Sequence, residues 1–161
     1  MSPLSKIALG GGCHWCTEAV FQSLKGVENV EQGFVASGGE HTRFSEAVIV
    51  HFYPREISLS QLIEVHLMTH KSSSSHRMRY KYRSAIYTFS DLQKEEASHH
   101  LNFYKRQNPK IITQVLNFKE FETSREEIQN YYLKDPQKPF CESYISPKLK
   151  NLEKNFKNLM H

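Results

Sequence analysis

Two cysteines, Cys13 and Cys16, lie three positions apart and directly follow three consecutive glycines. The segment before them, residues 5–10, has the pattern of a short buried strand, and apolar residues after Cys13 recur at helical steps. A thiol between a glycine turn and a helix start meets unpaired backbone N–H groups and the positive end of the helix dipole. Such a position lowers the pKa of a thiol, and glycines let a substrate approach it. The pattern predicts a nucleophilic cysteine at Cys13.

Three other interpretations of these cysteines are less consistent with the sequence. Cys13 as a small buried hydrophobic residue needs no chemistry. Zinc has candidate ligands in Cys13, His14 and Cys16, but structural zinc draws its ligands from two such clusters, and Cys141 stands alone. A total of three cysteines and the lack of a secretory leader disfavour a disulfide framework. We therefore expect a reactive thiol or a redox pair, and no metal.

The rest of the sequence alternates strand patterns with helix patterns. Strands are expected at residues 5–10, 27–35, 46–53, 83–89 and 111–118, and helices at residues 13–24, 58–70, 90–108, 123–133 and 146–159. Ser58 and Gln61 have the spacing of a capping box, which marks a helix start. These elements predict one domain over residues 1–161 with an α+β fold. We expect a two-layer α/β sandwich with a mixed or antiparallel sheet and a ferredoxin-like core.

Composition and charge exclude several classes of protein. The 161 residues are 39% hydrophobic and 24% charged, which is typical of a globular domain and excludes intrinsic disorder. No apolar run approaches the ~20 residues that span a bilayer, so we expect a cytoplasmic protein without membrane contact. The net charge of +4 permits an anionic partner but does not require one. Basic and apolar residues alternate over residues 77–82, which a strand with one solvated face explains, and we expect no nucleic-acid binding.

The glycine–cysteine segment, residues 11–18, resembles the Gly-Cys-Phe-Trp-Cys-x-Glu signature of the A-type peptide methionine sulfoxide reductases, which reduce the S epimer. Further segments resemble the same family in the same order along the chain. They are Ser45-Glu-Ala-Val48, Tyr53-Pro54 with Ile57-Ser58, Tyr82-Arg-Ser-Ala-Ile-Tyr87, Gln129-Asn-Tyr-Tyr132, and Pro139-Phe-Cys-Glu-Ser-Tyr-Ile-Ser-Pro-Lys148. Together they cover nearly the whole chain.

The resemblance implies a role for each matching residue in sulfoxide reduction. Cys13 would attack the sulfoxide sulfur as a thiolate. Glu46, kept protonated by burial, would give a proton to the departing oxygen, and Tyr82 would donate a hydrogen bond to the same oxygen. Trp15 would form the apolar wall of a pocket for the substrate methyl group, and His14 would border that pocket where the family has a phenylalanine.

The resemblance also implies how the thiol is regenerated. Cys13 would be left as a sulfenic acid, which a second thiol must resolve. Cys141 matches the resolving cysteine of the family, and Cys16 is a second candidate or a shuttle. Thioredoxin or another dithiol would then reduce the disulfide, without a metal or organic cofactor, and we expect a monomer.

Several positions depart from the family pattern. His14 makes the methyl pocket more polar, and the segment between Phe34 and Glu46 is about ten residues shorter, which removes a second oxygen-binding tyrosine. Losing that hydrogen bond would slow the reduction by about tenfold to a thousandfold. Arg77 stands where the family has an aspartate, and Phe44 stands where it has a histidine. The alternative function is therefore a weak or silent relative that acts as a thiol redox sensor or a peptide-binding module.

Two further features of the sequence give weaker indications of function. His66 and His70 lie four residues apart, as metal ligands can, but Leu67 stands where a zincin motif has a glutamate, so we interpret them as an ordinary helix face. Glu18 lies early in the first helix, and the sequence leaves its role open between favouring the helix dipole and steering the thiols.

Overall fold

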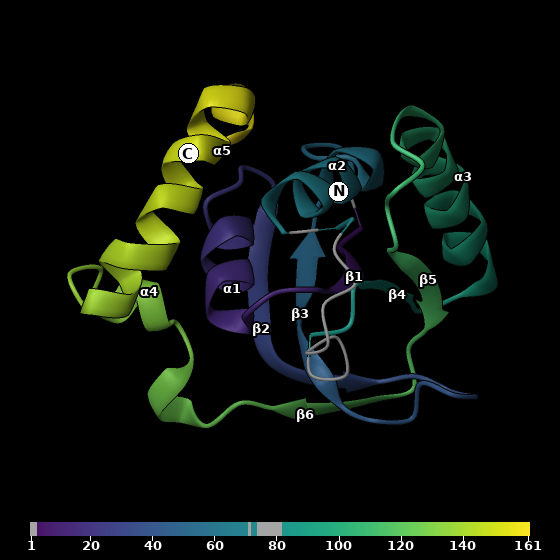
Figure 1. The fold of residues 1–161 in the computed structure, drawn as a ribbon, viewed down its shortest axis with the longest axis horizontal. Coiled ribbons are helices and arrows are strands. Elements are labelled where there is room, and N and C mark those ends of the chain that lie inside the picture. The colour runs from purple at the N-terminus through teal and green to yellow at the C-terminus, as the bar shows by residue number, and fades with distance from the viewer. Residues whose placement is uncertain (1–2, 71, 74–81) are drawn as a thin grey trace.

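The computed structural model describes residues 3–70, 72–73 and 82–161, which form a six-stranded sheet with helices packed against it (Figure 1). The strands are β1 (Ser5–Gly10), β2 (Val27–Ala36), β3 (Ser45–Phe52), β4 (Ala85–Thr88), β5 (Gln114–Asn117) and β6 (Glu120–Thr123). The helices are α1 (His14–Gln22), α2 (Leu59–Thr69), α3 (Asp91–Gln107), α4 (Tyr131–Lys134) and α5 (Ser146–Phe156). A π-helical turn, Cys141–Ile145, leads directly into α5.

The sheet has the strand order β5-β4-β1-β3-β2-β6. Its inner four strands, β4-β1-β3-β2, are antiparallel to their neighbours, with α1 connecting β1 to β2 and α2 connecting β3 to β4. This is the ferredoxin-like arrangement of two interleaved β-α-β units. β5 adds to β4 in parallel and β6 adds to β2 in antiparallel orientation, so the sheet is mixed. The predicted α+β class and ferredoxin-like core are confirmed.

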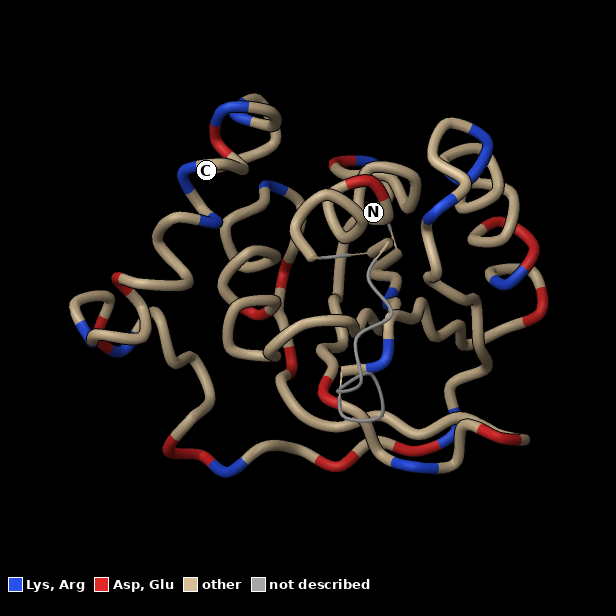
Figure 2. Tube along the Cα trace, viewed as in Figure 1, with Lys and Arg blue, Asp and Glu red and all other residues tan. Residues whose placement is uncertain are grey.

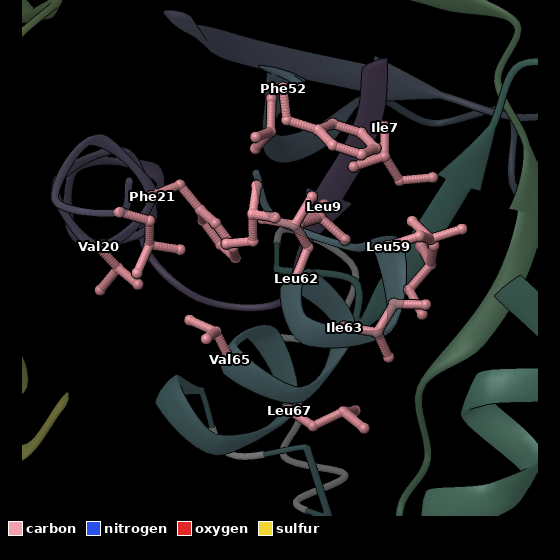
Figure 3. Close-up of a cluster of buried hydrophobic side chains, with 14 of the residues drawn as sticks. Ile7, Leu9, Val20, Phe21, Phe52, Leu59, Leu62, Ile63, Val65 and Leu67 are labelled. Atoms are coloured by element: carbon pink, nitrogen blue, oxygen red, sulfur yellow. The ribbon is translucent and has the colours of Figure 1, made fainter. Parts of the chain in front are cut away.

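The alternating residues of β3 explain how the two faces of the sheet are covered. Val48, Val50 and Phe52 belong to the main core, which also contains apolar residues of α1, α2, α3 and α5. Ala47 and Ile49 point to the opposite face and join a smaller cluster. Figure 3 shows Leu9, Phe21 and Leu62 of the main core meeting between β1, α1 and α2.

Helix starts agree with the capping signals of the sequence. Ser58 Oγ accepts a hydrogen bond from the Gln61 backbone N–H at 3.1 Å, and the Ser58 backbone N–H donates to Gln61 Oε1 at 3.0 Å. Both halves of the predicted capping box are therefore present at the start of α2. Ser90 caps α3 in the same way, with its Oγ 3.1 Å from the Gln93 backbone nitrogen.

One segment near the C-terminus differs from the prediction. The helix expected over residues 123–133 is replaced by the end of β6, a 3-10 turn (Glu126–Ile128) and the short helix α4. Asn130 separates the turn from α4 in the left-handed conformation, with φ 54°, which a continuous helix does not allow. Cys141 lies in the π-helical turn that leads into α5.

α3 and α5 each carry charges of both signs, and β6 carries only the two acidic residues Glu120 and Glu122 (Figure 2). Most of the basic alternation at residues 77–82 lies outside the described residues. Within the described part of the chain, no helix is long and apolar enough to cross a membrane.

Candidate active site

The candidate site lies where β1 ends and where β3 and β4 begin. Gly10 pairs with Ala47 of β3 on one side and with Ala85 of β4 on the other. A Cβ atom on Gly10 would lie 2.9 Å from the Glu46 carbonyl oxygen and 3.1 Å from that of Arg83. The three strands therefore approach more closely here than any side chain would permit. This convergence brings the glycine–cysteine segment next to Glu46.

The glycine turn also packs closely on α2. Gly11 has φ +146°, and a Cβ at this position would lie 2.5 Å from the His70 ring. His66 Nε2 donates to the Gly10 carbonyl oxygen at 2.7 Å, and His70 Nε2 lies 2.8 Å from Ser84 Oγ. The two histidines predicted to form an ordinary helix face thus support the turn that precedes Cys13. Among the described residues, no group of three histidine, cysteine or acidic side chains is arranged to hold a metal.

Cys13 is the N-cap residue of α1, as the sequence predicts. Its carbonyl oxygen accepts hydrogen bonds from the backbone N–H groups of Cys16 at 3.0 Å and Thr17 at 3.1 Å. The Cys13 side chain is partly exposed, whereas Cys16 and Cys141 are buried, and all three carry free thiols. Cys16 and Cys141 belong to one apolar cluster, and Cys13 packs against it.

The thiols of Cys13 and Cys16 influence each other's protonation. Their hydrogen bond, followed by burial, raises the pKa of Cys13 well above its usual range. The same hydrogen bond lowers the pKa of Cys16, and the Lys148 ammonium lowers it further. The prediction that the pKa of Cys13 is lowered is therefore wrong for the reduced thiols. The neighbouring Cys16 sulfur raises this pKa by more than the helix N-terminus lowers it. These two shifts favour a negative charge on Cys16 over one on Cys13.

Glu46 lies in β3, and its side chain is 7% exposed. Glu46 Oε1 accepts a hydrogen bond from the backbone N–H of His14 at 3.2 Å. The same oxygen lies 3.5 Å from Nε2 of the His14 ring. The predicted acid is thus held beside the residue that follows the predicted nucleophile.

His14 is buried, with 4% of its surface exposed. Its Nδ1 lies 3.0 Å from the Gly33 carbonyl oxygen, and its ring meets Phe34 edge-on with centroids 5.1 Å apart. Both ring nitrogens therefore face polar groups of the protein. The prediction that His14 borders a substrate pocket stays a prediction.

Trp15 packs against aromatic residues of the C-terminal segment. Its ring stacks on Tyr131 with centroids 4.3 Å apart and meets Phe140 edge-on at 5.1 Å. The Lys138 ammonium lies 4.3 Å from the Tyr131 ring centroid. Sequence reasoning did not single out Tyr131 or Phe140, although both lie in segments that resemble the family. Their position next to Trp15 depends on α4 and the π-helical turn packing against α1.

Glu18 connects α1 to the same C-terminal segment. Its Oε1 accepts hydrogen bonds from Gln32 Nε2 at 2.9 Å and from the Tyr131 backbone N–H at 3.2 Å. Its Oε2 accepts from the Asn130 backbone N–H at 3.0 Å. Burial raises the pKa of Glu18, against these hydrogen bonds. The sequence left its role open, and the structure shows that it satisfies the backbone at the start of α4.

Tyr82 precedes β4 and is half-buried. The next residue, Arg83, donates its backbone N–H to Ser45 Oγ at 2.7 Å, and Ser45 directly precedes Glu46. This contact ties the start of β4 to the start of β3, at the sheet end where Glu46 lies. Arg77 lies outside the described residues.

Comparisons with known proteins agree over nearly the whole chain. A family model described as peptide methionine sulfoxide reductase matches residues 5–160. A peptide methionine sulfoxide reductase MsrA from Acinetobacter baumannii (strain AYE) is 33% identical over 171 residues, covering 98% of this chain and 99% of that protein. The protein of the same name from Trichodesmium erythraeum (strain IMS101) is 35% identical over 171 residues, covering 95% and 96%.

Solved structures show the same fold. Mxr1 from Saccharomyces cerevisiae in reduced form has a TM-score of 0.77 at 22% identity, covering 88% of this chain and 91% of that chain. Methionine sulfoxide reductase A of Corynebacterium diphtheriae has a TM-score of 0.72 at 24% identity, covering 83% and 76%. Mxr1 in complex with Trx2 has a TM-score of 0.64 at 22% identity, covering 80% and 84%.

Proposed function

The chain belongs to the peptide methionine sulfoxide reductase family and reduces methionine S-sulfoxide, and we propose that Cys13 is its nucleophile and Glu46 its acid. The observation that carries this assignment is the contact between Glu46 Oε1 and the backbone N–H of His14, at 3.2 Å. Cys13 directly precedes His14, so this bond fixes the carboxyl group beside the thiol. Tyr82 is proposed as the second hydrogen-bond donor to the sulfoxide oxygen.

The first step forms a bond between the Cys13 sulfur and the sulfoxide sulfur. As Cys13 attacks, its proton passes to the Cys16 thiolate, to which it is hydrogen-bonded. The sulfoxide oxygen takes a proton from Glu46 and moves to the Cys13 sulfur. Methionine leaves with two more electrons on its sulfur, and Cys13 becomes a sulfenic acid. Trp15, with Tyr131 and Phe140 against it, supplies an apolar surface for the substrate methyl group.

The second step removes the oxygen as water. A thiol attacks the Cys13 sulfenic acid, a disulfide forms, and the oxygen leaves with the proton of that thiol. Cys141 and Cys16 are the proposed resolving thiols because both lie in the cluster against which Cys13 packs. Cys16 and Cys141 share that apolar cluster, and an oxidised Cys13–Cys16 pair would pass its disulfide to Cys141.

Thioredoxin or another dithiol is the proposed reductant of that disulfide, which completes the cycle without a metal or an organic cofactor. A solved structure of the similar protein Mxr1 holds Trx2 as its partner. We propose that the chain acts as a single domain over residues 1–161 and as a monomer. Its three free thiols suit a reducing compartment such as the cytoplasm. Methionine sulfoxide is its substrate, free or within a protein.

An epimer-resolved assay tests this assignment. Purified chain with thioredoxin, its reductase and NADPH is given each epimer of a methionine sulfoxide peptide, and methionine is quantified. We expect loss of the S epimer only, and no reduction by Cys13→Ser. Turnover of neither epimer, with Cys13 still open to alkylation, would contradict it. Peroxide-driven disulfide formation without sulfoxide consumption would instead support the redox-sensor alternative, which family membership does not favour.

A further inference from the structure

His14 stands where the family signature has a phenylalanine, and its ring lies between two fixed partners. Nδ1 lies 3.0 Å from the Gly33 carbonyl oxygen, and a carbonyl oxygen can only accept a hydrogen bond. Nδ1 therefore carries a hydrogen in the neutral ring as well as in the charged ring. Nε2 is then the nitrogen that gains or loses a proton, and it faces Glu46 Oε1 at 3.5 Å.

The two side chains are buried together, with 5% of the His14 side chain and 7% of the Glu46 side chain exposed. An unpaired charge at such a depth is costly, so the pair is stable in two states that share one proton. In one state Nε2–H faces a carboxylate, and in the other Nε2 faces a protonated carboxyl group. The His14 backbone N–H, which also donates to Oε1, keeps the carboxyl group in place in both states.

Among the described residues, α1 and α5 contribute ionisable groups that interact with the pair or with its neighbouring thiols. Cys13 and Cys16 lie on the same helix as His14, and the charge of Glu46 acts on both thiols. Lys148 of α5 acts on Cys16 from beside Gly12. Tyr82 lies before β4, and the apolar Phe34 of β2 covers the His14 ring. Glu46 is the carboxyl group that the structure places at Nε2.

We propose that His14 is a positioning residue that keeps a proton available to Glu46 at pH values where a carboxyl group alone has lost it. During reduction, the proton moves from Nε2 to Glu46, and then from Glu46 to the sulfoxide oxygen. The proton that Cys13 passed to Cys16 returns to the pair through solvent, so sulfenic acid formation consumes no net proton. This role rests on the proposed function of Glu46 as the acid.

The state of the ring is tested without substrate by NMR of ¹⁵N-histidine-labelled protein across pH. We expect Nδ1 to stay protonated throughout and Nε2 to titrate, and the midpoint to fall in Glu46→Gln, which removes the carboxylate partner. A neutral ring with its hydrogen on Nε2, or a midpoint that Glu46→Gln leaves unchanged, would overturn the proposal.

The functional consequence is tested by single-turnover methionine formation at a series of pH values. His14→Phe installs the family residue and His14→Gln keeps a polar group that does not titrate. In both variants, the pH above which the rate falls is expected to move down by about one to two units. His51→Gln is the matched control, because His51 Nε2 lies 2.6 Å from Glu31 Oε2 in a partly exposed pair on the sheet.

The outcomes distinguish a failure of Glu46 as the acid from a failure of His14 as its positioning residue. If Glu46→Gln retains the wild-type rate, the assignment of Glu46 as the acid fails and the role of His14 falls with it. If Glu46→Gln is inactive but both His14 variants change the rate by the same factor at every pH, Glu46 remains the acid. The proposed role of His14 is then overturned. If the control His51→Gln lowers the pH above which the rate falls as much as the His14 variants do, the shift is not specific to the site. The proposal is again overturned.

Discussion

The two regions that supply thiols to the active site are held in place differently. Cys13 follows a turn that the backbones of three converging strands and the His70 ring enclose. Cys141 lies in a segment held against α1 by side chains, namely by the two hydrogen bonds that Glu18 accepts from the Asn130 and Tyr131 backbone and by the stack of Tyr131 on Trp15. Backbone pairing involves many coupled contacts, whereas a few side-chain contacts open more easily. We therefore expect a rigid nucleophile and a resolving segment that can move.

The largest expected effect separates the two thiols by function. Cys141→Ser leaves the nucleophile intact, so one methionine per chain still forms in a single turnover. Steady-state reduction with thioredoxin should fall on the order of a hundredfold, because the oxidised Cys13 is no longer resolved efficiently. Burst amplitude and steady-state rate measure the two steps. Undiminished turnover would show that Cys16 alone resolves, and mass spectrometry of the oxidised variant would then find a Cys13–Cys16 bridge.

The rigidity of the glycine turn is tested by Gly11→Ala. The added methyl group meets the His70 ring at 2.5 Å, and φ +146° is strained for alanine. We expect a loss of about 2–4 kcal/mol in the free energy of unfolding, measured by urea denaturation. Gly39→Ala is the control, because φ +63° is also strained but nothing lies within 4 Å of the new atom. Equal losses in both variants would show that close packing on His70 contributes nothing.

The looser attachment of the Cys141 segment is tested by Tyr131→Ala. Removing the stack on Trp15 should favour opening by about 0.5–1.5 kcal/mol, which makes alkylation of Cys141 roughly twofold to twelvefold faster. Leu133→Ala, on the same short helix but 62% exposed, is the control. An unchanged alkylation rate would mean that the stack does not restrain this segment.

The smallest effect concerns the pH dependence of stability through Glu18. Its pKa in the folded chain is raised above the ordinary 4.5, mainly by burial, so the native state binds this proton more tightly than the unfolded chain does. The contribution of Glu18 to stability is therefore complete below pH 4.5 and is lost as the pH rises through the raised pKa. Glu18→Gln should remove that decline, by about 1 kcal/mol or less in urea titrations. An identical decline in the variant, or its removal by Glu95→Gln on α3, would contradict this account.

The same contrast explains which features the sequence could predict. The glycines, the helix start at Cys13 and the capping box at Ser58 are local signals, and all of them appear as expected. The segment after residue 120 depends on distant partners, because β6 pairs with β2 and Glu18 caps α4 from another helix. No spacing of residue types within residues 120–145 predicts those contacts. The pKa of Cys13 was also mispredicted, since the orientation of the Cys16 sulfur is not a property of sequence spacing.

The position of Glu18 has a consequence for how this enzyme tolerates change. One carboxylate joins the helix of the nucleophile to the start of the segment that carries Cys141, across more than a hundred positions of the chain. The spacing between the two thiols is therefore set locally in space. Insertions and deletions in the intervening connections, such as the short one between Ala36 and Ser45, can therefore accumulate. They do not alter the distance between the thiols of Cys13 and Cys141, across which the disulfide is exchanged.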